Sequence, residues 1–294
     1  EGLVAAGNIF MGMTESPVLI KNYLPTMNRS EIFLVMVSGM GTIAGSVMGT
    51  YIGMLGGTDP AAKVLFATHL LSASVMAVPG SIVLAKMLCP QTEEATDHVA
   101  ISGKEKENSN ILDAISSGTV TGVKLMTNIA AMLLVFISLV ALANYITEGV
   151  IGRYTGLNDW IVKITDGKAQ GLTFQFILGV ITSPFMWLIG VPSQDIMLVG
   201  SFLGHKTILN EFVAYFQLQQ WKDAGLFMYE KSILMSTYIL CGFANISSIG
   251  ILLGGLGVLA PEKRGLISRI GLPAMIGGAL VSVLSATIIG MILG

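Results

Sequence analysis

The sequence predicts an all-α protein that crosses a membrane several times and carries an inverted repeat. Of the 294 residues, 53% are hydrophobic and 12% are charged, and the mean hydropathy is +0.74. Soluble domains carry about 25% charged residues, so this composition does not suit a surface that faces water on all sides. Several stretches also approach or exceed the roughly 20 apolar residues that a helix needs to cross a bilayer core.

Six apolar stretches are the candidate spanning or near-spanning helices. They lie at 32–55, 64–88, 125–146, 172–191, 233–260 and 267–293. The net charge is −2 and no basic run is present, which excludes nucleic acid as a partner because its binding demands clustered Lys and Arg. The expected surroundings are therefore a lipid bilayer.

Two of these stretches are interrupted by glycine and polar residues. "SGMGTIAGS" at 38–46 and "CGFANISSIG" at 241–250 place Ser, Thr or Asn near the middle of a potential span. Broken backbone at membrane depth is tolerated only where it is buried in protein or lines a cavity. A polar-tipped stretch precedes each break, with Glu15 in "GMTESP" and Glu211 in "LNEFVAY". Paired interrupted segments at corresponding positions indicate a transport site near the membrane midplane.

The predicted order is thus a re-entrant hairpin, a broken helix and a whole spanning helix, given twice. Two short interfacial helices are expected near 110–117 and 158–167, where amphipathic sequence and Trp160 suit the membrane face. In chain order the predicted segments are a partial hairpin 1 at 1–25, the broken and spanning helices of repeat 1 at 26–90, a polar loop with an interfacial helix at 91–118, a scaffold-type spanning helix with an interfacial helix at 119–170, an apolar segment with hairpin 2 at 171–227, and the broken and spanning helices of repeat 2 at 228–294.

Glu15 and Glu211 are the first candidates for a binding role, because ionisable residues within membrane segments are costly and are usually functional. A carboxylate can accept charge-assisted hydrogen bonds from two neighbouring hydroxyls, which suits a sugar or nucleoside and repels a phosphate. Thr14, Asn245 and Ser248 could complete such a network. Asn8, Thr42 and the carbonyls freed at a helix break form an oxygen set of the kind that sodium takes in transporters.

An intramembrane enzyme is the alternative from another class, with Glu15 or Glu211 as general base beside His205. Such an enzyme needs a nucleophile or a metal set at sensible spacing. The sequence contains no HExxH, paired CxxC, GxSxG or Walker pattern. We therefore predict a protein that is not an enzyme.

Four stretches closely resemble the concentrative nucleoside transporter family: "GNIFMGMTESPVLI", "MNRSEIFLVMVSGMGTIAGSVMGTYI", "GVPSQDIMLVGSFLGHKTILNEFVAY" and "CGFANISSIGILLGGLGVLAP". The resemblance implies a homotrimer in a bacterial-type inner membrane that imports nucleosides by sodium symport. It further implies elevator-like movement of a transport domain past a scaffold, and scaffold segments ahead of residue 1. Proton coupling is the nearest variant, with Glu15 or Glu211 titrating.

The resemblance also implies individual roles. Glu211, Asn245 and Ser248 would hold the ribose, while Phe243 would pack near the base. In repeat 1, the substrate-binding positions would be Gly12, Met13, Thr14 and Glu15 at the hairpin tip and Val47 as an apolar wall. A sodium ion would take the side chains of Asn8 and Thr42 and the carbonyls of Met11 and Ile43. Met13 stands where family members commonly carry Gln, so base preference is not carried over.

Overall fold

The structure is a computed structural model that describes residues 1–93, 110–113, 115, 116, 119, 120, 123, 127, 134, 138, 139, 141–165, 167 and 169–294. Its regular elements within these residues are helices, which agrees with the predicted all-α class. They are α1 (Gly2–Gly7), η1 (Ser16–Ile20), α2 (Arg29–Gly41), α3 (Gly45–Gly56), α4 (Pro60–Leu88), the π-helix η2 (Tyr145–Gly152), α6 (Arg153–Thr155), α7 (Leu157–Ile164), α8 (Phe174–Leu188), α9 (Ile196–Ile208), α10 (Glu211–Asp223), α11 (Glu230–Leu240), α12 (Ile246–Leu259), η3 (Pro261–Lys263) and α13 (Arg264–Leu293).

Among the described residues, three helical runs are long and apolar enough to cross a membrane: Arg29–Gly56, Pro60–Leu88 and Pro261–Leu293. Large apolar side chains are exposed along them, among them Val64, Val75 and Val83 of α4 and Leu272, Ile276 and Leu280 of α13. Exposed apolar side chains in such number are expected where lipid, rather than water, surrounds a helix. The prediction of a polytopic membrane protein agrees with these helices.

The other predicted apolar stretches have different outcomes. The stretch at 172–191 forms α8, whose 15 residues are shorter than a full membrane crossing requires. The stretch at 233–260 is divided between α11 and α12. The stretch at 125–146 and the polar loop lie largely outside the described residues. In the first predicted interfacial segment residues 111–113, 115 and 116 are helical, and α7 overlaps the second.

The first repeat-like unit contains α1, η1, α2, α3 and α4. Asn28 begins α2 with a capping box. Its side-chain Oδ1 accepts from the backbone amide of Glu31, and its backbone amide donates to Glu31 Oε2. The helix stops at Gly41, and Thr42 is extended with φ −121° and ψ 167°. The chain resumes as α3 at Gly45, so the predicted break is present.

The second unit repeats this order with α9, α10, α11, α12 and α13. The antiparallel pair α9 and α10 forms a helical hairpin whose tip is Leu209 and Asn210. Asn210 caps α10 by accepting from the Val213 amide at 2.9 Å. The second break separates α11 from α12 and is followed by Asn245 as the cap of α12.

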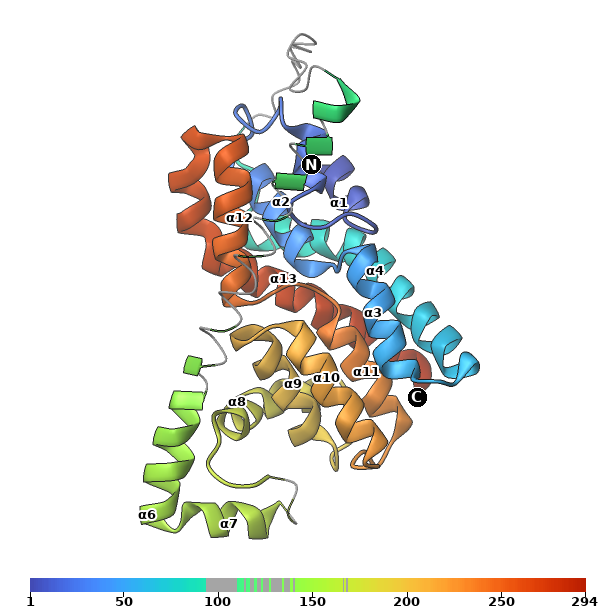
Figure 1. The fold of residues 1–294 in the computed structure, drawn as a ribbon, viewed down its shortest axis with the longest axis vertical. Coiled ribbons are helices and arrows are strands. Elements are labelled where there is room, and N and C mark those ends of the chain that lie inside the picture. Colours follow the sequence, from blue (N-terminus) through green and yellow to red (C-terminus); the bar gives the residue numbers. More distant parts are fainter. Residues whose placement is uncertain are drawn as a thin grey trace.

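Helix α13 connects two hydrophobic clusters. It packs against α2, α4, α11 and α12, and in Figure 1 it runs between the group of α1, α2 and α12 and the group of α8 to α11. One cluster contains side chains of α1, α2, α4, α12 and α13, and the other contains side chains of α3, α4, α8, α9, α10, α11 and α13. Phe243 packs against both clusters, which places the second break at their junction.

Candidate functional site

The two helix breaks contact each other through their backbones. Gly242 has φ +145°, and a Cβ built there would lie 2.9 Å from the carbonyl oxygen of Met40 and 3.0 Å from that of Gly41. The amide of Phe243 donates to the carbonyl of Thr42 at 3.2 Å. Only glycine combines this φ with so close an approach. The end of α2 and the end of α11 therefore form one junction.

Glu211 is buried beside this junction as the first residue of α10, with 6% of its surface exposed. Its Oε1 accepts from the Tyr51 hydroxyl at 3.2 Å, and its Oε2 accepts from the Asn245 side-chain amide at 3.1 Å. A carboxylate at a helix N-terminus is also stabilised by the helix dipole. The side chain is thus held by donors from two other helical segments.

Asn245 is fixed by its second role as the cap of α12. Its Oδ1 accepts from the Ser248 amide at 2.8 Å and from the Ser248 hydroxyl at 3.0 Å. The Ser247 hydroxyl donates to the same oxygen at 2.6 Å. Because the oxygen is engaged in capping, the NH₂ group is directed to Glu211. The predicted residues Glu211, Asn245 and Ser248 therefore form one hydrogen-bonded network.

Tyr51 of α3 belongs to this network and was missed from the sequence. Its side chain is fully buried, and its ring stacks on Tyr215 with the ring centroids 4.1 Å apart and an interplanar angle of 26°. A tyrosine in an apolar segment is usually a core or interface residue, so the sequence does not mark it as part of a site. The available signal was that a buried phenol needs a hydrogen-bond partner, but the sequence does not identify Glu211 as that partner.

The tip of the first hairpin lies between α2 and α12. Met13 packs so closely on Gly39 that a Cβ there would lie 2.8 Å from the Met13 Cβ, and Thr14 approaches Gly255 of α12. Glu15 turns back over Gly12 and is exposed, unlike Glu211. Val47 is half-buried against the second cluster. Within the described residues, no hydrogen bond joins Glu15 to Glu211.

Of the residues predicted to hold sodium, Thr42 and Ile43 lie at the first break, whereas Asn8 and Met11 lie between α1 and η1. Asn8 is fully buried, donates to the Ser38 hydroxyl at 3.0 Å and accepts from the Ser16 hydroxyl at 2.5 Å. The Thr42 hydroxyl donates to the Ser38 carbonyl at 3.0 Å.

The carbonyls of Met11 and Ile43 lie outside helices, and in the described part of the chain no donor occupies them. These neutral oxygens suit a hard monovalent cation, while no cluster of three His, Cys, Asp or Glu side chains occurs in that part.

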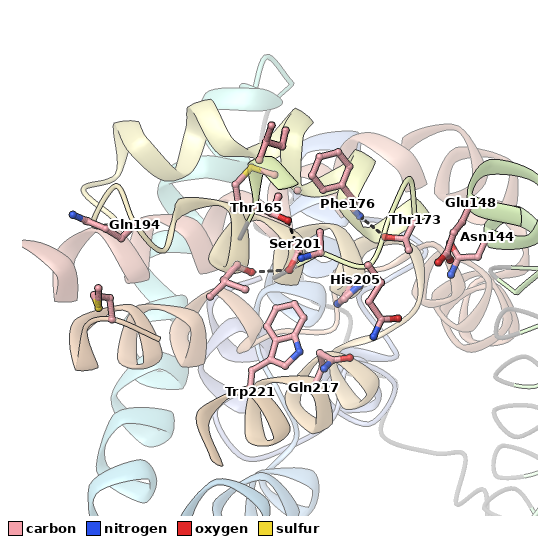
Figure 2. A pocket seen from close by; sticks show the side chains of 17 residues that line it. Asn144, Glu148, Thr165, Thr173, Phe176, Gln194, Ser201, His205, Gln217 and Trp221 are labelled. Carbon is pink, nitrogen blue, oxygen red and sulfur yellow. Dashed lines mark hydrogen bonds between the residues drawn. The ribbon is translucent and has the colours of Figure 1, made fainter. Parts of the chain in front are cut away.

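His205 lies apart from the Glu211 network. Its ring packs near Phe202 and Trp221, with centroid distances of 6.5 Å to each, and neither ring nitrogen has a hydrogen-bond partner among the described residues. It borders a cavity of about 780 Å³ lined by residues of α8, α9, α10 and the segment before α8 (Figure 2). The pairing of His205 with Glu211 that an enzyme would need is therefore not formed.

Comparisons with known proteins agree on one family. The family described as "Na+ dependent nucleoside transporter C-terminus" matches residues 69–290. Sodium/nucleoside cotransporter 1 of Rattus norvegicus is 39% identical over 306 residues, which cover 99% of this chain and 44% of the relative. Nucleoside permease NupC of Helicobacter pylori is 38% identical over 296 residues, which cover 100% of this chain and 65% of the relative.

Solved structures give the same result. The structure of CNTnw in an inward-facing substrate-bound state matches with a TM-score of 0.79 and 34% identity, covering 99% of this chain and 64% of that one. Other matching structures show CNTnw variants in outward-facing and intermediate states. The chain spans about two thirds of the length of the bacterial relatives that it matches.

Proposed function

The chain belongs to the Na+ dependent nucleoside transporter C-terminus family, and on this premise we propose that it forms the substrate-binding part of a nucleoside symporter. Its relatives and structural neighbours are nucleoside transporters rather than enzymes. The observation that carries the proposal is the buried network of Glu211, Asn245 and Ser248 at the junction of two broken helices.

The nucleoside binds through two kinds of contact. Glu211 accepts hydrogen bonds from ribose hydroxyls, and Asn245 and Ser248 complete the polar contacts. Both Glu211 oxygens already accept protein hydrogen bonds, so the carboxylate is held in place before the substrate arrives. The base lies against the apolar and hairpin-tip residues of the two repeats, which are Gly12, Met13, Thr14, Glu15, Val47 and Phe243.

The coupling cation binds at the first break. Sodium takes the side-chain oxygens of Asn8 and Thr42 and the carbonyls of Met11 and Ile43, and thereby orders the first hairpin against α2 and α3. Since that hairpin also contacts the nucleoside, sodium and nucleoside each tighten the binding of the other. Proton coupling is the second candidate, and the exposed Glu15 carboxylate at the hairpin tip is the observation that favours it.

The whole protein then acts as a homotrimer in the bacterial inner membrane. In each protomer the hairpins and broken helices move together across the membrane, in an elevator-like cycle that exposes the site to each side in turn. Outward-facing, intermediate and inward-facing structures of CNTnw support such a cycle by analogy. The re-entrant character of the two hairpins is part of this proposal.

Calorimetric titration tests the coupling, on a protein that carries this chain together with the scaffold segments that the proposal places ahead of it, called here the full-length parent. We expect nucleoside to bind more tightly in sodium than in choline, and Thr42→Val to remove this difference. Thr68→Val is the matched control, because the hydroxyls of Thr42 and Thr68 each donate to the backbone carbonyl four residues earlier. Equal nucleoside affinity in sodium and choline for the unmodified protein would contradict sodium coupling.

A further inference from the structure

Lys206 places an ammonium group in the interior of the second repeat. Its side chain is completely buried on α9, the arm of the hairpin that leads to Glu211. A buried charge is costly unless it is paired or hydrogen-bonded. Lys206 Nζ donates to the carbonyl of Ile239 at 2.8 Å and to the hydroxyl of Ser282 at 2.8 Å. One side chain thus joins α9 to α11 and α13.

Both of these contacts lead to the break after α11. Ile239 lies in the last turn of α11, whose carbonyls have no partner within the helix. Ser282 donates in turn to the carbonyl of Cys241 at 2.8 Å, the residue that follows the helix. Carbonyls at a helix C-terminus carry partial negative charge and favour a cation. Lys206 therefore satisfies one freed carbonyl directly and a second through Ser282.

Lys206 also acts on the nucleoside network without belonging to it. No ion-pair contact joins its ammonium to the Glu211 carboxylate among the described residues. The break that Lys206 holds is followed directly by Asn245, which donates to Glu211. The tether and the substrate network thus share the segment 241–245.

In the first repeat, the contacts between the hairpin and the helix break are made by neutral groups. There the hairpin approaches the break through the bond from Asn8 to Ser38 and through the bond from the Gly45 amide to the Phe10 carbonyl at 3.0 Å. The carbonyl of Ile43 accepts no hydrogen bond within the described residues. The C-terminal end of α2 has the same dipole as that of α11. Among the contacts just described, however, no charged side chain lies at the end of α2 as Lys206 does at the end of α11.

We propose that Lys206 is a tethered cation, which does at the second break what a mobile cation does at the first. Its ammonium holds the hairpin of α9 and α10 to the end of α11 and so keeps Asn245 directed at Glu211. Lys206 is a positioning residue and not a ligand of the nucleoside. The comparison with a mobile cation rests on the proposed function, whereas the tether itself does not.

Hydrogen exchange of the full-length parent, without substrate, tests the tether. In Lys206→Met, which keeps the length but not the charge, we expect the amides of 241–248 to exchange about tenfold faster or more, because the break opens locally more often. Lys206→Arg should restore slower exchange. Lys222→Met is the matched control, because Lys222 also donates to a helix-end carbonyl, that of Leu55.

Unchanged exchange in Lys206→Met, or equal acceleration in Lys222→Met, would overturn the tether. If Lys206→Met does not fold, Ser282→Ala keeps the lysine and removes the relay to Cys241, and it should accelerate exchange of the same amides. Unchanged exchange in a folded Ser282→Ala protein would count against the relay.

Sodium-dependent uptake by the full-length parent then tests the comparison with a mobile cation. Lys206→Ala leaves room at the carbonyls of the second break, so its sodium activation curve should become steeper than that of the unmodified protein, while Lys206→Met should not gain steepness. If Lys206 acts in packing alone, both variants should lose the same fraction of uptake and keep the steepness of the sodium activation curve. That result would overturn the comparison. Failure of the unmodified protein to transport would count against the proposed function, while hydrogen exchange would still decide the tether.

Discussion

At the scale of single residues, the site depends on how two side chains hold Glu211. Tyr51 comes from the first repeat and Asn245 from the second, so the carboxylate joins the two repeats. Their approach has different causes, because Asn245 is positioned by capping α12 whereas Tyr51 is positioned by stacking on Tyr215. Removing one donor should therefore weaken substrate binding without unfolding the protein.

Tyr51→Phe is the sharpest variant of this kind. It removes the hydrogen bond to Glu211 and keeps the ring that stacks on Tyr215. The Tyr51 hydroxyl orients the carboxylate that the ribose contacts, so we expect the nucleoside dissociation constant to rise about tenfold. Hydrogen bonds to charged groups also contribute about 1.5–3 kcal/mol to stability, so the Tm should fall by a few degrees while the protein stays folded. Titration calorimetry and thermal unfolding of the full-length parent measure both. A large fall in Tm with unchanged affinity would show that Tyr51 acts in packing alone.

At the scale of elements, the helix breaks were predictable from the sequence, but the tertiary partners of individual side chains were not. Glycine and polar residues inside apolar stretches correctly indicated the ends of α2 and α11. Such residues in the middle of a potential span are expected where the helix is interrupted inside the protein. The partner of Lys206 is Ser282, 76 residues away, and that of Tyr51 is Glu211, 160 residues away. Such pairs arise from tertiary packing, which periodicity and local motifs do not encode.

Lengths were less predictable than breaks. The stretch 172–191 is mostly apolar, yet α8 ends at Leu188, because Gly190 turns the chain with φ +85° and the Val191 amide donates to the Met186 carbonyl at 3.0 Å, ahead of the turn into α9. Asp195 accepts from the amides of Met228 and Tyr229 at 3.1 Å each, which ties this turn to the start of α11. Composition alone could not show that the apolar run bends back instead of continuing.

The contact between the breaks gives a prediction for Gly242. Alanine there would have to adopt φ near +145° and would place its Cβ against the Met40 carbonyl. Strain of this kind costs about 1–3 kcal/mol, so Gly242→Ala should lower the Tm of the full-length parent by several degrees.

Gly254→Ala is the control for this prediction. It lies within α12 with no heavy atom within 4 Å of the added Cβ, so it should leave the Tm unchanged or raise it. Equal Tm values for the Gly242→Ala protein and the unmodified protein would contradict the backbone contact.

At the scale of the whole molecule, α13 connects the two repeats and the second break lies between the two hydrophobic clusters. A nucleoside held at this junction would contact both hairpins and both broken helices. Substrate and cation would thus favour the same arrangement of the repeats, which is the physical basis of their coupling. The central claim is therefore that a cation gradient drives nucleoside accumulation through Glu211.

Uptake into proteoliposomes tests this claim most directly. The full-length parent is reconstituted beside Glu211→Gln and beside Glu230→Gln, a matched control that alters the exposed first residue of α11. Radiolabelled uridine and adenosine are supplied with and without an inward sodium gradient, and with a protonophore. We predict sodium-driven accumulation that Glu211→Gln abolishes and Glu230→Gln retains. Absence of nucleoside accumulation under every gradient, or full accumulation by Glu211→Gln, would contradict the account.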